Sequence, residues 1–192
     1  MLKKNLCGLF AALFAAGFAG CGGGPRTYTV VDGTMLGTTL HVVADVEGVS
    51  SQELYAAVME LDREAKASMS IFDPASLLSR LNRNETDSVD RHIAFNLRLA
   101  DSIGALSGGR YDVTVKPLVE AWGFAGKAAQ AHPNVDSILD FVGREKVRIE
   151  RGRLVKSDPR VQLDFNSVAK GYTVDLLAEL VERFGAENYI VD

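Results

Sequence analysis

The sequence DFNSVAKGYTVD, at residues 164–175, carries the most information in this chain. It follows an apolar segment with Val161 and Leu163, a pattern that indicates a strand ending at a carboxylate and opening a helix. Asn166 is a residue type that favours the N-cap position. We expect the helix to run over residues 166–184 and to stop at Gly185.

The side chains at this junction suit a phosphate group and a metal ion. A helix N-terminus offers unpaired N–H groups and the positive end of a dipole, both of which favour an anion. Lys170 adds a cation, while Asp164 and Ser167 carry hard oxygen atoms of the kind that Mg²⁺ binds. Helix capping alone would also account for Asp164 and Ser167, so the flanking pattern has to decide between the two interpretations.

A second segment, GGRYDVTVKPLVEAWGF at residues 108–124, supplies that pattern. With it the chain resembles the ApbE family, the FAD:protein FMN transferases. The family patterns run like G-x-(Y/F)-D-(V/I)-T-V-x-P-L-V-x-x-W-G-F and D-(F/L)-(N/G)-(S/A)-(V/I)-A-K-G-Y-x-V-D. Weaker matches are LGTT at residues 36–39 and MSIF at residues 69–72, followed by SLLSRLN at residues 76–82. The resemblance covers residues 28–192.

The resemblance implies a Mg²⁺-dependent transfer of FMN from FAD to a Thr or Ser of a target protein, with release of AMP. The catalytic side chain is left unassigned, and Ser167 is the position that the resemblance assigns to the metal. The positions that it assigns to FAD binding are Leu36, Phe72, Arg110, Tyr111, Asp112, Asp164 and Lys170.

Two of these positions depart from the family pattern. Leu36 stands where the family has the Met of its M-G-T motif, and Phe72 where it often has Tyr. Phe keeps an aromatic face for stacking and loses the hydroxyl.

Aromatic and histidine side chains elsewhere are not assigned to the site. Trp122 and Phe124 are expected in the core or in a pocket wall. The three histidines, His41, His92 and His132, show no metal-binding spacing, and none is a good general base.

The first residues are typical of an export signal. Lys3 and Lys4 precede an apolar run over residues 6–18, too short for a transmembrane helix. Residues 1–20 then form a lipoprotein signal peptide, Cys21 is the lipidation site, and residues 21–27 are a tether before a domain at residues 28–192. An ordinary signal peptide cut nearby is the alternative. The lipoprotein interpretation predicts an exported protein anchored to a membrane of the cell envelope and facing the periplasm.

Composition restricts the other classes of partner. Cys7 lies in the predicted signal, so Cys21 alone remains and no disulfide framework can form. The formal net charge of −4 makes the chain mildly acidic, and we expect no basic stripe that would bind nucleic acid. The partners that the resemblance implies are FAD and a target protein, and the predicted lipid anchor adds a membrane.

The order of the expected elements indicates an α+β fold, with mixed sheets and packed helices. Strands are expected over residues 28–31 and 40–44, joined by a turn at Asp32-Gly33 or at Gly37. Ser50 and Glu53 form a capping box before a helix. Further helices are expected over residues 76–81, after Asp90, from Pro117 to Trp122, and from Pro133 with its apolar side facing in. A hairpin is expected over residues 146–156, and a strand over residues 189–191.

The family continues beyond the last strand into a Gly-Gly loop and further metal ligands. The sequence is therefore expected to be incomplete at its C-terminal side. A non-catalytic remnant or FAD-binding module of the same family is one alternative function. Hydrolysis of the FAD diphosphate is another, since it needs the same diphosphate and metal. A tethered solute-binding lipoprotein would account for the signal but for neither motif.

Overall fold

The structure is a computed structural model that describes residues 26–192. The predicted signal peptide, Cys21 and most of the predicted tether lie outside the described residues. The helices and small antiparallel sheets confirm the α+β fold. In chain order the elements are β1 Thr29–Met35, β2 Thr38–Ala44, α2 Ser51–Met69, α3 Leu77–Asn82, α4 Arg91–Leu106, α5 Lys116–Ala121, α6 Val135–Leu139, the 3₁₀ turn η2 Arg144–Lys146, β3 Val147–Glu150, β4 Arg153–Lys156, α7 Asn166–Arg183 and β5 Tyr189–Val191. No helix within residues 26–192 is long and apolar enough to cross a membrane.

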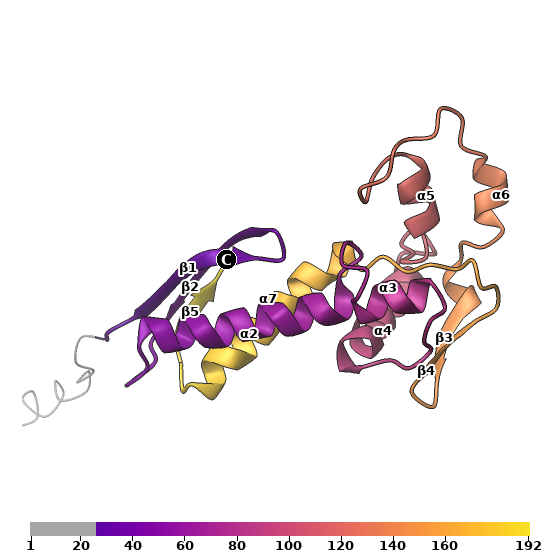
Figure 1. Cartoon of the computed structure of the whole chain (residues 1–192). Coiled ribbons are helices and arrows are strands. Elements are labelled where there is room, and N and C mark those ends of the chain that lie inside the picture. Colours follow the sequence, from indigo (N-terminus) through magenta and orange to yellow (C-terminus); the bar gives the residue numbers. More distant parts are fainter. Residues whose placement is uncertain (1–25) are drawn as a thin grey trace, which may run out of the picture.

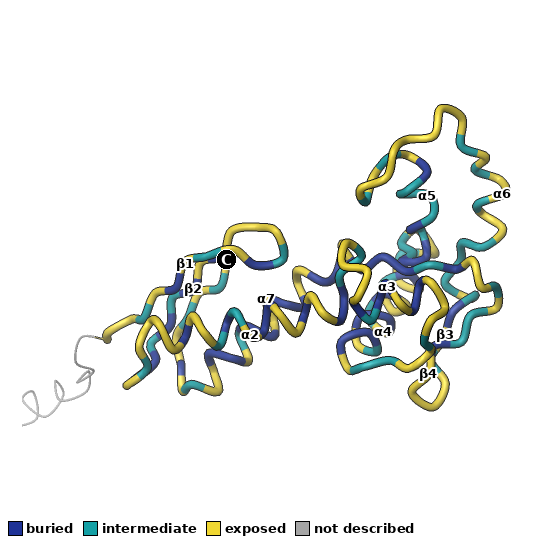
Figure 2. Tube along the Cα trace, in the orientation of Figure 1, coloured by how far each residue is buried: buried dark blue, intermediate teal, exposed yellow. Residues whose placement is uncertain are grey.

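Two long helices, α2 and α7, lie side by side and form the middle of the molecule (Figure 1). The three-stranded sheet β1-β2-β5 packs against them at one end. Helices α3 and α4 and the β3-β4 hairpin gather at the other end, and α5 and α6 project from it. The apolar core follows this arrangement along the facing sides of the helices and the inner face of the sheet (Figure 2).

The sheet is antiparallel, and β2 is its central strand. Met35 pairs with Thr38, so the β1-β2 turn consists of Leu36 and Gly37, with φ angles of 49° and 76°. This is the second of the two turn positions that the sequence offers, and β1 continues through Gly33. The terminal strand β5 pairs with β2 through Val42–Val191 and Val43–Ile190.

Side chains alternate across the sheet with the period of two that strands require. Val31, Met35, Leu40, Val42 and Ala44 are buried against the helices. Helix α2 contributes the buried stripe Leu54, Val58, Leu61 and Ala65, and α7 contributes Leu176, Leu177, Leu180 and Val181. The capping box at Ser50 and Glu53 is present in both directions, as the sequence predicts.

The expected strand at residues 161–164 is wrong. The segment is extended, but its backbone forms only one isolated parallel bridge, Val115–Gln162, among the described residues. The Asn82 side chain takes the place of a neighbouring strand: Nδ2 donates to the Leu163 carbonyl at 2.9 Å and Oδ1 accepts from the Leu163 N–H at 2.7 Å. The sequence could not show this, because 81 residues separate the two.

Helices α5 and α6 differ from expectation in their packing. Helix α6 has no buried residue, although its apolar side was expected to face in. Trp122 and Phe124 are 57% and 66% exposed, so neither lies in the core, and the core alternative of the prediction is wrong for both. The reason is that residues 116–143 project away from the two long helices (Figure 1).

A buried histidine connects α4 to α7. His92 is buried, and its Nδ1 lies 2.9 Å from the Tyr172 hydroxyl. Nε2 accepts from the Arg91 guanidinium, so Nδ1 carries the proton of the neutral ring and donates to Tyr172. Burial holds the pKa of His92 below its ordinary value, with a smaller upward effect from Asp90 and Glu64 and a downward one from Arg91.

We expect Asn82→Ala to lower the free energy of unfolding by about 2–4 kcal/mol, because it leaves a buried N–H and a buried carbonyl of Leu163 without partners. Urea denaturation measures the loss. Ser102→Ala is the matched control: its hydroxyl is exposed and bonds the Arg98 carbonyl of its own helix, so its effect should stay within about 0.5 kcal/mol. Equal effects of the two substitutions would contradict the role of Asn82.

We expect His92 to make the protein less stable as the pH falls. Because its pKa is depressed in the folded state, the unfolded chain binds more protons near and below the ordinary value of about 6.5. The contribution is complete above that value and is lost as pH falls through the folded pKa. Urea midpoints at about pH 7.5 and 5.5 should therefore differ more in the wild type than in His92→Gln, which cannot titrate. Parallel decreases in both proteins would contradict this assignment.

Candidate functional site

The N-terminus of α7 is arranged differently from the sequence prediction. The N-cap residue is Phe165, whose ring is fully buried, and Asn166 is the first helical residue. The predicted N-cap at Asn166 is therefore wrong. Asp164 does the capping instead: its Oδ1 accepts the Asn166 N–H at 2.8 Å. A carboxylate at this place satisfies one unpaired N–H and complements the positive end of the helix dipole.

The two long motifs meet at this helix end. The Tyr111 hydroxyl and the Ser167 hydroxyl are hydrogen-bonded at 2.8 Å, across 56 residues of sequence. The Asp164 N–H also donates to the Val113 carbonyl at 2.8 Å. The segment at residues 108–124 and the segment at residues 164–175 therefore form one local structure.

An open pocket of about 730 Å³ lies beside this helix end. Three predicted FAD-binding residues line it: Leu36 from the β1-β2 turn, Phe72 from the loop after α2, and Lys170 from α7. Phe72 is 67% exposed, so an aromatic face is available to a ligand. The remaining lining residues are Gly37, Lys66, Met69, Ser70, Asp73, Asn166 and Ala169.

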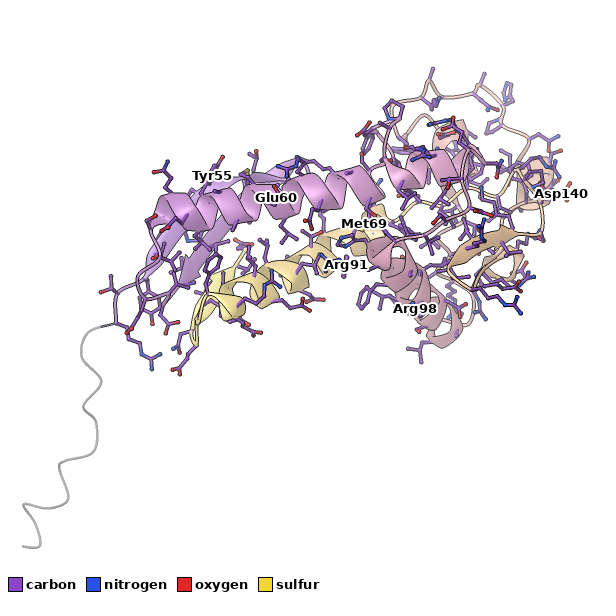
Figure 3. The ribbon with its side chains drawn as sticks, turned by 60° about the horizontal axis from the view of Figure 1, so that its bottom comes forward. Tyr55, Glu60, Met69, Arg91, Arg98 and Asp140 are labelled. Carbon is purple, nitrogen blue, oxygen red and sulfur yellow. The ribbon has the colours of Figure 1, made fainter. Side chains whose placement is uncertain are left out.

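The pocket forms where the helices converge. Met69 is the last residue of α2, close to the start of α4 at Arg91 (Figure 3). The loop that follows is held by Ser70, whose hydroxyl accepts the N–H groups of Phe72 and Asp73 at 3.1 Å. The loop carrying Phe72 therefore has a defined backbone conformation at the rim of the pocket.

The other predicted site residues lie near the helix end but do not line this pocket. Arg110 is exposed. Asp112 is half-buried, and its Oδ1 accepts from both the N–H and the hydroxyl of Thr114, at 2.8 and 2.7 Å. The Thr114 hydroxyl in turn accepts the Gly143 N–H at 2.7 Å. Asp112 thus orders the start of the segment before α5, and one of its oxygens is already used for that purpose.

The donor chemistry suits Mg²⁺ at Ser167. Its side chain is exposed and, among the described residues, bonds Tyr111 alone, which leaves oxygen lone pairs for a ligand. Within residues 26–192 no three His, Cys, Asp or Glu side chains come together as a metal site. Mg²⁺ is commonly held by few protein oxygens together with water and substrate phosphates, and Ser167 fits such a site as one ligand.

Sequence reasoning missed Lys66 and Asn166 as pocket residues. Lys66 lies on the polar side of α2, and charged residues on an amphipathic helix are usually a solvated face. Its place beside Leu36 and Lys170 comes from the packing of the sheet and α7 against α2. No local sequence signal could have identified it.

The fold is that of an α+β protein, and comparison with known proteins shows its family. The model of the ApbE family matches residues 36–192. A relative from Haemophilus influenzae, named FAD:protein FMN transferase, is 31% identical over all of this chain and 59% of its own length. The chain belongs to the ApbE family.

Solved structures of flavin transferases are similar to this chain in fold. The flavin transferase ApbE from Vibrio cholerae has a TM-score of 0.81 and 30% identity, over 88% of this chain and 57% of that one. The apo flavinyl transferase ApbE from Pseudomonas stutzeri matches in fold, with a TM-score of 0.81 at 24% identity over 86% of this chain and 56% of that one. The chain thus spans somewhat more than half the length of these relatives.

We expect two substitutions at Asp164 to separate capping from ligand binding. Asp164→Ala removes the acceptor for the Asn166 N–H and a charge at the helix N-terminus, and should cost about 1–2 kcal/mol in urea denaturation. Asp164→Asn keeps an acceptor oxygen and should cost less than half as much. If Asp164→Asn preserves stability but weakens FAD binding, the carboxylate also serves the ligand. Unchanged FAD affinity in Asp164→Asn would reduce its role to capping.

Proposed function

We propose that this chain binds FAD in the pocket beside the N-terminus of α7 and takes part in Mg²⁺-dependent transfer of FMN to a Thr or Ser of a target protein, releasing AMP. One observation carries the proposal. Leu36, Phe72 and Lys170, from three motifs far apart in the sequence, line a single pocket. The names of the relatives, which are FAD:protein FMN transferases, support the same activity.

The pocket offers each part of FAD a matching group. The exposed ring of Phe72 and the apolar side chain of Leu36 suit a planar ring system. Lys170 and Lys66 suit phosphate charge, and the N-terminus of α7 adds the positive end of its dipole. The neighbouring segment at residues 110–112 carries donors and a carboxylate that suit a ribose or an adenine.

The reaction replaces the phosphoanhydride bond of FAD with a phosphoester bond to the acceptor. The oxygen of the acceptor Thr or Ser forms a bond to the FMN phosphorus, the bond from that phosphorus to the bridging oxygen breaks, and AMP leaves with the electron pair. The acceptor hydroxyl loses its proton, and no side chain within residues 26–192 is assigned as the base. Mg²⁺, when bound, neutralises diphosphate charge. The chain's own part is to bind and orient the diphosphate through Lys170 and Ser167.

The location of the protein is part of the proposal. An export signal at residues 1–20 and lipidation of Cys21 would anchor the chain to a membrane of the cell envelope, facing the periplasm. Acceptor proteins would then be sought among exported or membrane proteins with exposed Thr or Ser.

The test is FAD titration by calorimetry, followed by incubation with FAD, Mg²⁺ and candidate acceptor proteins. FMN attached to an acceptor, detected by mass spectrometry together with AMP in the supernatant, supports transfer. AMP and free FMN without a modified acceptor indicate diphosphate hydrolysis instead. FAD binding without either product indicates a binding module. Absence of FAD binding would overturn the proposal.

We expect Lys170→Met to weaken FAD binding about tenfold, because a charge-assisted contact to a phosphate is worth about 1.5–3 kcal/mol. Calorimetric titration at two salt concentrations measures it, and the wild type should lose more affinity with salt than the variant. Lys127→Met removes a lysine that does not line the pocket and should bind as the wild type. A wild-type affinity for Lys170→Met would exclude Lys170 from the site.

A further inference from the structure

The β1-β2 turn is the most strained part of the pocket rim. Both of its residues have positive φ, as a type I′ hairpin turn requires, at 49° for Leu36 and 76° for Gly37. Glycine adopts this conformation freely, whereas Leu has a Cβ that makes it costly; Asn and Gly are the usual residues at the first position. A Leu is therefore expected to need support from outside the turn.

Asp62 supplies a contact of this kind. Its side chain is 11% exposed, on the face of α2 that meets the sheet, and its Oδ1 accepts the Leu36 N–H at 3.0 Å. The contact joins the turn to a 19-residue helix whose inner stripe is part of the core. A bond from a strained turn to a rigid helix fixes where the Leu36 side chain lies at the pocket.

The second oxygen of Asp62 holds a pocket lysine. Oδ2 accepts from the Lys66 ammonium, one helical turn further along α2. Lys66 is 47% exposed and lines the same pocket as Leu36 and Lys170. The pair compensates a largely buried carboxylate, and it keeps the ammonium on the pocket side of the helix.

We propose that Asp62 is a positioning residue of the site: one carboxylate oxygen holds the left-handed Leu36 turn, and the other orients Lys66 toward the pocket. The inference rests on the proposed function in taking FAD as the ligand. Lys66 then provides, with Lys170, a second cation for the diphosphate. Asp62 itself touches no ligand and acts through these two residues.

The experiment compares Asp62→Ala, Asp62→Asn and Lys66→Met in the full chain. Glu60→Gln is the matched control: Glu60 lies on the same helix, is exposed and pairs with Arg63 (Figure 3). Two quantities are measured. Amide hydrogen exchange of Leu36, without any ligand, reports whether the turn is held. FAD affinity reports the consequence for the site.

Asp62→Ala should speed exchange of the Leu36 amide at least about tenfold and weaken FAD binding about tenfold or more. Asp62→Asn keeps an acceptor for the turn, so it should restore most of the protection while FAD binding stays weakened through Lys66. Lys66→Met should leave Leu36 protected and lower both the FAD affinity and its salt dependence. Glu60→Gln should resemble the wild type in both measurements.

Other outcomes would overturn the inference. Unchanged Leu36 exchange in Asp62→Ala would show that Asp62 does not hold the turn. Faster exchange with unchanged FAD affinity would show that the turn is held without positioning the site. A wild type that binds no FAD refutes the proposed function instead, and the exchange rates still decide whether Asp62 holds the turn. Should Asp62→Ala fail to fold, the FAD affinities of Asp62→Asn and Lys66→Met still decide whether Asp62 positions Lys66: wild-type affinity in both would overturn the inference.

Discussion

The contact on which the rest of this structure depends is the pairing of the Asn82 side-chain amide with the backbone of Leu163. An extended segment buried without a strand on each side would leave polar backbone groups unpaired, at a cost of about 1–3 kcal/mol each. Asn82 satisfies both groups of Leu163, so Val161, Leu163 and Phe165 can all be fully buried. This segment leads directly into α7, so the place of the helix N-terminus follows from it.

Helix α7 then serves two purposes along its length. Its first two turns face the pocket with Asn166 and Lys170, whereas the apolar side chains of its later turns pack into the core. Between them Tyr172 bonds His92 and stacks on Phe95, with ring centroids 4.5 Å apart. Because these pocket residues stand on an element fixed by its own core contacts, their positions need no ligand to define them.

Local signals in the sequence predicted local structure well. The capping box at Ser50, the cap at Asp90 and the hairpin of β3 and β4 all form, because the residues that decide them are neighbours in the chain. The strand at residues 161–164 and the N-cap at Asn166 were wrong for the opposite reason. Asn82 and Val113, which hold that segment, are distant in sequence, and no periodicity reports such contacts.

The same distinction applies to the site. Leu36, Phe72 and Lys170 could be named because motifs mark them, and the structure brings all three to one pocket. Asp62 and Lys66 could not, since a polar pair at helical spacing looks the same whether it faces solvent or a ligand. What distinguishes Asp62 is its second bond, to a turn residue with positive φ in another element. Motifs therefore identify residues that line the pocket, whereas residues that hold the pocket lining in place are found through contacts between elements.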